Sequence, residues 1–152
     1  LDVRLSPEDW AVPGGGDFPG AFGTGGVIAM DETTCMVEAA LNLIEFYADQ
    51  SCGQCPPCRE GAPWLGEVVR RIEEGRGREG DMDLLQSIAA QVSPLLSDQR
   101  ATLCSFGQRF AWPLQAFVRA FAEEFERHIH EERCPIAKDP AIKVPDTVSV
   151  RF

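Results

Sequence analysis

The chain has 152 residues, of which 44% are hydrophobic and 25% charged, and its formal net charge is -10 at pH 7. This composition is typical of a globular protein and excludes a disordered or fibrous chain. The negative charge disfavours binding to nucleic acid or to an anionic membrane surface. Because no apolar run approaches about 20 residues, direct membrane insertion is not expected.

The first 30 residues favour turns over helix, because seven of the 14 glycines fall in the first 26 positions. They end in a short apolar run, residues 26–30, which is bounded by glycine and by two acidic residues. This pattern is typical of a buried strand, so we place a boundary near residue 31. Since the chain starts at Leu1 as though a fold were already under way, we expect a fragment or a cleaved piece of a longer protein.

Two helices are predicted in the first half of the remaining chain, from apolar residues that recur at helical spacing. The first follows Asp31, and its apolar face is Met36, Val37, Ala40, Leu41, Ile44 and Tyr47. The second has Pro63 in its first turn and Gly75 as its stop signal. Its apolar face is Trp64, Leu65, Val68 and Ile72.

Two further helices follow. The third is entered through Asp81 and interrupted at Pro94, with Leu85, Ile88 and Val92 on one face. The fourth is a single long helix from about residue 112 to residue 130 with a stripe of phenylalanines, which we assign to the core. Four amphipathic helices with short connections predict a mainly α fold built as a four-helix bundle. After residue 134, three prolines and then alternating apolar residues predict an extended arm.

Six cysteines are present, and three of them form the run Cys52-Gly53-Gln54-Cys55-Pro56-Pro57-Cys58. This spacing lets successive thiolates converge from a tight loop onto one polynuclear centre. A bacterial two-cluster ferredoxin would need a fourth cysteine four residues further on, where alanine stands. Cys104 lies in a non-helical link between the third and fourth helices, so we predict that it is the fourth ligand.

Other interpretations of these residues stay open. Disulfides would explain six cysteines, but neighbours in the triple are poorly placed to pair and no export signal precedes the fold. Structural zinc is the stronger rival, although it usually takes two separated Cys-x-x-Cys pairs. Cys35 and Cys134 are interpreted as small buried or free thiols, and His128 and His130 as part of a solvated acidic helix face.

Three stretches resemble the flavoprotein subunit of NADH:quinone oxidoreductase (complex I) and together cover about residues 20 to 135. The run from Gln50 to Gly61 resembles its cluster signature, with Gln50 where the family pattern has Glu. Residues 23–32 resemble the end of its β-grasp domain. Residues 103–108 and 111–115 resemble its fourth-ligand loop and last helix. Diaphorase subunits of NAD-reducing hydrogenases and of NAD-dependent formate dehydrogenases share this module.

The resemblance implies a remnant of a β-grasp domain (1–30) and an iron-sulfur helical bundle (31–134), and the proline pattern adds an extended C-terminal arm (135–152). It also implies that Cys52, Cys55, Cys58 and Cys104 bind a 4Fe-4S cluster, which takes single electrons from reduced FMN and passes them to clusters in partner subunits.

By the same resemblance, FMN and NAD(H) bind an upstream domain or a partner chain. The chain would be part of an NADH-oxidising complex without being catalytic by itself. It would be cytoplasmic, or peripheral on the cytoplasmic face of a membrane through that complex. The alternative is a zinc-stapled helical interaction module without redox activity.

Overall fold

The computed structural model describes residues 28–94 and 101–136, and this part of the chain is mainly helical, as predicted. Within those two ranges it has five helices and no strand: α2 (Met36–Gln50), α3 (Pro56–Glu73), α4 (Asp81–Val92), α5 (Phe106–Ala120) and α6 (Ala122–Glu131). Residues 28–30 have no regular structure, and Ile28 is 81% exposed, so the prediction of a buried strand is wrong for these residues. The rest of the predicted β-grasp remnant and nearly all of the predicted arm lie outside the described residues.

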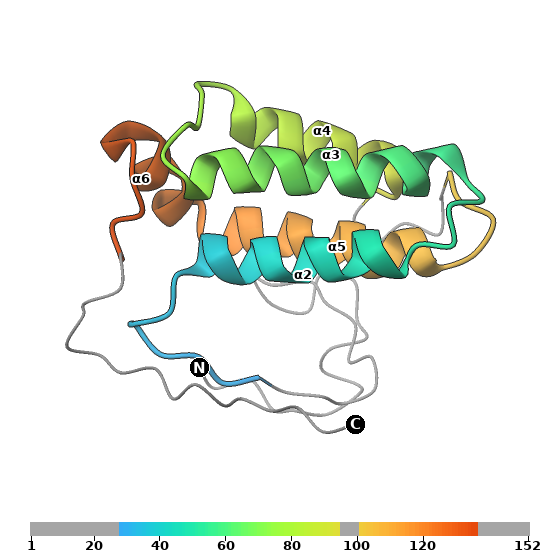
Figure 1. Cartoon of the computed structure of the whole chain (residues 1–152), viewed down its shortest axis with the longest axis horizontal. Coiled ribbons are helices and arrows are strands. Elements are labelled where there is room, and N and C mark those ends of the chain that lie inside the picture. Colours follow the sequence, from blue (N-terminus) through green and yellow to red (C-terminus); the bar gives the residue numbers. More distant parts are fainter. Residues whose placement is uncertain (1–27, 95–100, 137–152) are drawn as a thin grey trace.

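The first four of these helices lie side by side, and α6 packs across one end of them (Figure 1). The ends of the helices therefore gather in two places. The end of α2 and the starts of α3 and α5 meet at one end of the molecule. The start of α2, the end of α3 and α6 meet at the other. No helix in the described ranges is long and apolar enough to cross a bilayer.

The core lies between the helices, where the apolar faces predicted from helical periodicity meet. Each fully buried aliphatic or aromatic side chain contributes roughly 1.5–3 kcal/mol by leaving water. The buried side chains include Val37, Ala40, Ile44, Leu65, Val68, Ile72, Leu85, Val92, Phe110, Leu114 and Phe125.

Helix α3 begins earlier than predicted. It starts at Pro56, with Cys55 as its N-cap, because Pro56 and Pro57 occupy first-turn positions where no backbone N–H is required. Pro63 consequently lies inside the helix. Trp64 is 59% exposed, so its assignment to the apolar face is wrong.

The predicted long helix from residue 112 to residue 130 is two helices in the structure. Helix α5 already begins at Phe106 and contains Pro113 in its interior. It ends at Ala120, and the backbone of Phe121 leaves helical geometry (φ -118°, ψ 29°) before α6 begins. The break turns α6 across the end of the other helices, which a continuous helix could not reach (Figure 1).

The turn between α3 and α4 is held by a buried ion pair. Arg71 Nε donates to Asp81 Oδ2 at 2.8 Å, and the backbone N–H of Arg78 donates to the same oxygen at 2.9 Å. Burial alone would raise the pKa of Asp81, but the Arg71 guanidinium and the Arg78 N–H together lower it below its ordinary value.

Candidate metal centre

The cysteine triple occupies the connection between α2 and α3. Gly53 has φ +71°, a left-handed conformation that favours glycine, and it reverses the chain just after α2 ends. Arg59 Nη1 donates to the Gly53 carbonyl at 3.0 Å, which ties the loop back onto the first turn of α3. The turn and the helix start thus bring the three cysteines to one end of the helices, and their convergence on one polynuclear centre stays a prediction.

The four predicted ligands are all free thiols with different exposure. Cys58 is buried on the first turn of α3, Cys55 is partly buried, and Cys52 and Cys104 are exposed. Cys104 lies in the non-helical link just before α5, as predicted. The backbone N–H of Leu103 donates to Cys55 Sγ at 3.3 Å, so this link contacts the triple directly.

The Cys58 thiol interacts electrostatically with the three other predicted ligands. Burial raises the pKa of the Cys58 thiol, and the charges of Cys52, Cys55 and Cys104 raise it further. Ser51 Oγ lies 3.2 Å from Cys58 Sγ, and the hydrogen bond between them lowers the pKa of Cys58. The raised pKa keeps the Cys58 thiol protonated in the absence of a compensating charge, whereas a bound cationic centre would favour its thiolate.

Two helix N-termini face this site. Cys55 is the N-cap of α3, and Cys104 immediately precedes Ser105, the N-cap of α5. Pro56 and Pro57 have no N–H, and the Cys58 N–H is bonded to the Cys55 carbonyl, so at α3 only the positive end of the helix dipole stabilises negative charge. The dipole of α5 acts in the same direction. The sequence folds this way because proline or a short polar residue stands at each helix start.

Close packing holds the link that carries Cys104. The Thr102 hydroxyl donates to the Cys104 carbonyl at 2.8 Å. Gly107, on the first turn of α5, leaves no room for a side chain: a Cβ there would lie 2.7 Å from Thr102 Oγ1 and 3.0 Å from a methyl group of Val92. Glycine at this position therefore lets α5 approach both the link and α4.

The remaining cysteines lie at the opposite end of the helices, near His128. Cys35 is buried, as expected for a small buried thiol, but His128 is fully buried, so its assignment to a solvated face is wrong. His130 is exposed, as predicted. Burial raises the pKa of both Cys35 and Cys134. Glu73, which contacts Cys35 and His128, was not predicted as a site residue. The sequence signal for this group is a histidine, His128, just before the end of the fourth predicted helix and a cysteine, Cys134, just after it.

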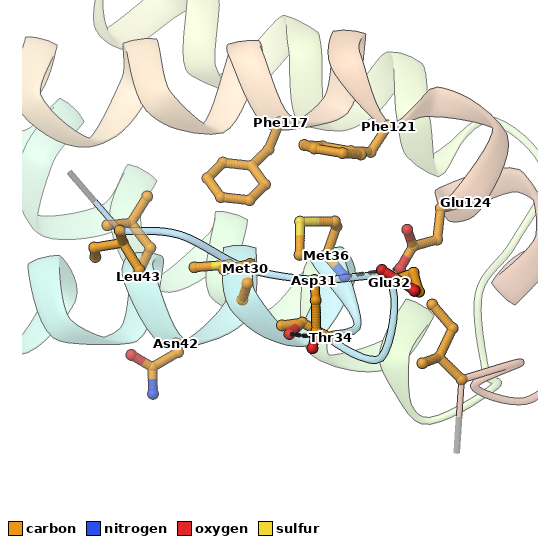
Figure 2. Close-up of a pocket in the computed structure, with 13 residues that line it drawn as sticks. Met30, Asp31, Glu32, Thr34, Met36, Asn42, Leu43, Phe117, Phe121 and Glu124 are labelled. Atoms are coloured by element: carbon orange, nitrogen blue, oxygen red, sulfur yellow. Dashed lines mark hydrogen bonds between the residues drawn. The ribbon is translucent and has the colours of Figure 1, made fainter. Parts of the chain in front are cut away.

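An open groove of about 930 Å³ lies beside the segment that precedes α2. Figure 2 shows Phe117 and Phe121 on one side of it and Met30 and Met36 on the other. The Met36 N–H donates to Glu124 Oε1 at 2.7 Å and joins the start of α2 to α6. No cysteine lines the groove, so it is not part of the thiol site.

Comparison with known proteins assigns this arrangement to a family. Residues 38–128 match the model of the NADH-ubiquinone oxidoreductase-F iron-sulfur binding region, which covers more than half of the chain and includes all four predicted ligands.

Individual relatives agree with this match. The chain is 41% identical over 115 residues to the mitochondrial NADH-ubiquinone oxidoreductase 51 kDa subunit of Neurospora crassa, which covers 76% of this chain and 22% of the relative. It is 40% identical over 141 residues to an NADH-quinone oxidoreductase subunit of Streptomyces coelicolor, and the match covers 93% of this chain and 28% of the relative. It is 38% identical over 135 residues to the NADP-reducing hydrogenase subunit HndC of Solidesulfovibrio fructosivorans, and the match covers 89% of this chain and 25% of the relative.

The chain spans about a quarter of the length of these relatives, all of which are subunits of oxidoreductases. The matched region contains the loop, the link and the two helix starts described above. The chain therefore belongs to the family of the NADH-ubiquinone oxidoreductase-F iron-sulfur binding region.

Proposed function

We propose that the chain is the electron-transfer module of an NADH-oxidising complex and that Cys52, Cys55, Cys58 and Cys104 hold one 4Fe-4S cluster. The observation that supports this most directly is the meeting of the cysteine triple with the Cys104 link, through the hydrogen bond from the Leu103 N–H to Cys55 Sγ. Membership of an iron-sulfur binding family supports the same assignment.

The residues present fit such a cluster. Four thiols from two segments give the donor set that 4Fe-4S clusters take. No lysine, carboxylate or histidine contacts these four sulfurs in the hydrogen bonds and ion pairs of the described residues. A zinc ion could use the same thiols, and the contents of zinc and sulfide distinguish it from an iron-sulfur cluster.

When bound, a cluster of this type accepts and returns one electron at a time. The protein's own part is to tune and shield it. Ser51 Oγ and the Leu103 N–H lie within hydrogen-bonding distance of Cys58 Sγ and Cys55 Sγ, and such bonds to sulfur raise the reduction potential. The N-termini of α3 and α5 favour the added negative charge in the same direction.

Exposure of the thiols is uneven, which suits a relay. Cys58 faces the core while Cys52 and Cys104 are exposed, so one side of the site is open to electron donors or acceptors. In the proposed assembly, NADH reduces FMN that is bound in an upstream domain or a partner chain. The reduced FMN then supplies the electrons. Iron-sulfur subunits of the complex receive them. We also propose that the chain lies in the cytoplasm or at the cytoplasmic face of a membrane.

The test is low-temperature electron paramagnetic resonance of the anaerobically purified protein after reduction with dithionite, with iron, zinc and sulfide measured in the same sample. We expect the signal of a reduced 4Fe-4S cluster and about four irons and four sulfides per chain. Cys104→Ser should lose the signal and most of the iron, whereas the matched variant Cys134→Ser should keep both.

Zinc bound at these cysteines without sulfide would refute the relay and favour a zinc-stapled interaction module. Iron retained unchanged in Cys104→Ser would refute the choice of the fourth ligand while leaving the triple in place.

A further inference from the structure

A second group of metal-binding side chains lies at the end of the helices opposite the cysteine triple. Cys35, Glu73, His128 and Cys134 each offer one donor atom, and these four atoms all lie within 4.8 Å of one another. His128 Nε2 is 3.1 Å from Glu73 Oε2 and 3.3 Å from Cys35 Sγ, and Cys35 Sγ is 3.3 Å from Glu73 Oε2. Cys134 Sγ completes the group, within the same 4.8 Å of each of the other three donor atoms.

Each of these residues comes from a different element. Cys35 is the N-cap of α2, Glu73 is the last residue of α3, His128 is in α6 and Cys134 follows α6. Residues this far apart in the sequence meet only because α6 turns across the end of the other helices.

The histidine ring is oriented for a ligand. Its Nδ1 lies 2.8 Å from the Glu124 backbone carbonyl, which can only accept a hydrogen bond, so Nδ1 carries the proton. Nε2 then faces the other three donor atoms. A histidine whose second nitrogen donates to a backbone carbonyl is the usual arrangement around a protein-bound metal. His128 is fully buried and Cys35 is 4% exposed, so water does not compete at these two donors.

The distances fit one tetrahedral ion. With bonds of about 2.0–2.3 Å to nitrogen, oxygen and sulfur, neighbouring ligand atoms of a zinc site lie about 3.3–3.8 Å apart. The three separations of 3.1–3.3 Å between donor atoms need an outward shift of only a few tenths of an ångström on binding. Two sulfurs, one imidazole nitrogen and one carboxylate oxygen are donors that zinc accepts together.

We propose that Cys35, Glu73, His128 and Cys134 bind a structural Zn²⁺ ion that fastens α6 to α2 and α3. Four protein ligands close the coordination sphere, which is the pattern of a structural rather than a catalytic zinc site. Zinc has no accessible second oxidation state, so the ion takes no part in electron transfer.

This site is separate from the proposed iron-sulfur site. Cys35 and Cys52 stand at opposite ends of α2, whose 15 residues extend for about 22 Å. Cys58 and Glu73 are likewise near opposite ends of α3. The two metal contents can therefore be altered independently.

The test is metal analysis of the anaerobically purified protein after dialysis against a mild chelator, with zinc K-edge X-ray absorption on the same sample. We expect about one zinc per chain, with two sulfur and two nitrogen or oxygen neighbours. His128→Gln and Cys134→Ser should each lose the zinc and keep the iron. The matched control His130→Gln, an exposed histidine on the same helix, should keep both metals. Cys104→Ser should show the reverse pattern, losing iron and keeping zinc.

Several results would overturn the proposal. These are wild-type protein without zinc, zinc that persists in both His128→Gln and Cys134→Ser, and an absorption spectrum with only oxygen and nitrogen neighbours, which marks an adventitious ion. A Cys35–Cys134 disulfide found by mass spectrometry in the anaerobic protein would also overturn it. Because the absorption spectrum is taken on wild-type protein, the proposal remains testable even if a variant fails to fold.

Discussion

Replacing Gly75 with alanine should destabilise the protein, because this glycine lies where the end of α3 meets the end of α6. Gly75 follows the C-cap of α3 with φ +71°. Its N–H donates to the Ile72 carbonyl at 3.1 Å, and the Arg76 N–H donates to the Arg71 carbonyl at 2.7 Å. These two bonds make a Schellman motif, which requires a left-handed residue at this position.

The expected loss follows from two separate costs. A left-handed conformation costs alanine about 1 kcal/mol relative to glycine. In addition, a Cβ on Gly75 would overlap the Glu132 carbonyl group and lie 2.7 Å from Arg133 N, all of them main-chain atoms that cannot simply rotate away. Overpacking of this kind costs a further 1–3 kcal/mol or so, which brings the expected total to about 2–4 kcal/mol.

Gly80 provides a matched control. It has φ +90°, but a Cβ there would meet no atom within 4 Å. Gly80→Ala should therefore cost only about 1 kcal/mol, from backbone strain and a poorer N-cap for α4. The difference between the two variants isolates the contact between the ends of α3 and α6.

The assay is urea unfolding followed by circular dichroism on anaerobically purified, metal-containing protein. We expect the midpoint of Gly75→Ala to lie clearly below that of Gly80→Ala, with an unchanged slope. The zinc content of Gly75→Ala should also fall, because the same contact positions Glu73 beside α6. Equal midpoints for the two variants would show that the end of α6 is not packed against Gly75.

Two further predictions concern the α3–α4 turn and the Cys104 link. Asp81→Asn should cost about 2–3 kcal/mol at neutral pH, because it leaves the mostly buried Arg71 guanidinium without its partner. Since the pKa of Asp81 is lowered by folding, this contribution is present above about pH 4 and is lost as the pH falls through the lowered pKa. Denaturation from pH 3 to pH 7 should show the variant and the wild type converging in acid. The exposed Asp83→Asn should track the wild type, and a gap that persists at low pH would contradict the assignment. Gly107→Ala should lower the free energy of unfolding by about 1–3 kcal/mol and speed the loss of the cluster, which is measured as iron release over time. Gly66→Ala, where a Cβ would make only an ordinary 3.8 Å contact, should do neither, and equal release rates would contradict the packing argument.

Local sequence signals were sufficient where the relevant interactions are themselves local. The buried faces of α2 and α4 follow from helical periodicity, and the tight cysteine loop follows from three thiols spaced by glycine and proline. The position of Cys104 in a non-helical link was also predicted correctly. Its role as a cluster ligand, with that of the other three cysteines, stays a prediction until the metal content is measured.

Helix boundaries were predicted less well, because proline has two opposite meanings in sequence. Pro63 and Pro113 were interpreted as helix starts, yet both lie inside helices. The lost hydrogen bond and the ring clash cost a few kcal/mol, a penalty that the tertiary packing of α3 and α5 outweighs. The helical spacing of apolar residues also continues through Phe121, where the chain turns, because α5 and α6 each have an apolar face. The sequence therefore predicted one helix where the structure has two.

The convergence of Cys35, Glu73, His128 and Cys134 could not be predicted from the sequence. The four residues are spread over 100 positions, and an acidic helix with two histidines is usually solvated on its polar face. The turn between α5 and α6 decides that His128 faces inward and His130 outward. The amino-acid sequence thus determined the chemistry available, namely six thiols and the spacing of three of them. Tertiary packing decided which distant side chains share a site, because such contacts depend on helix directions that no local pattern encodes.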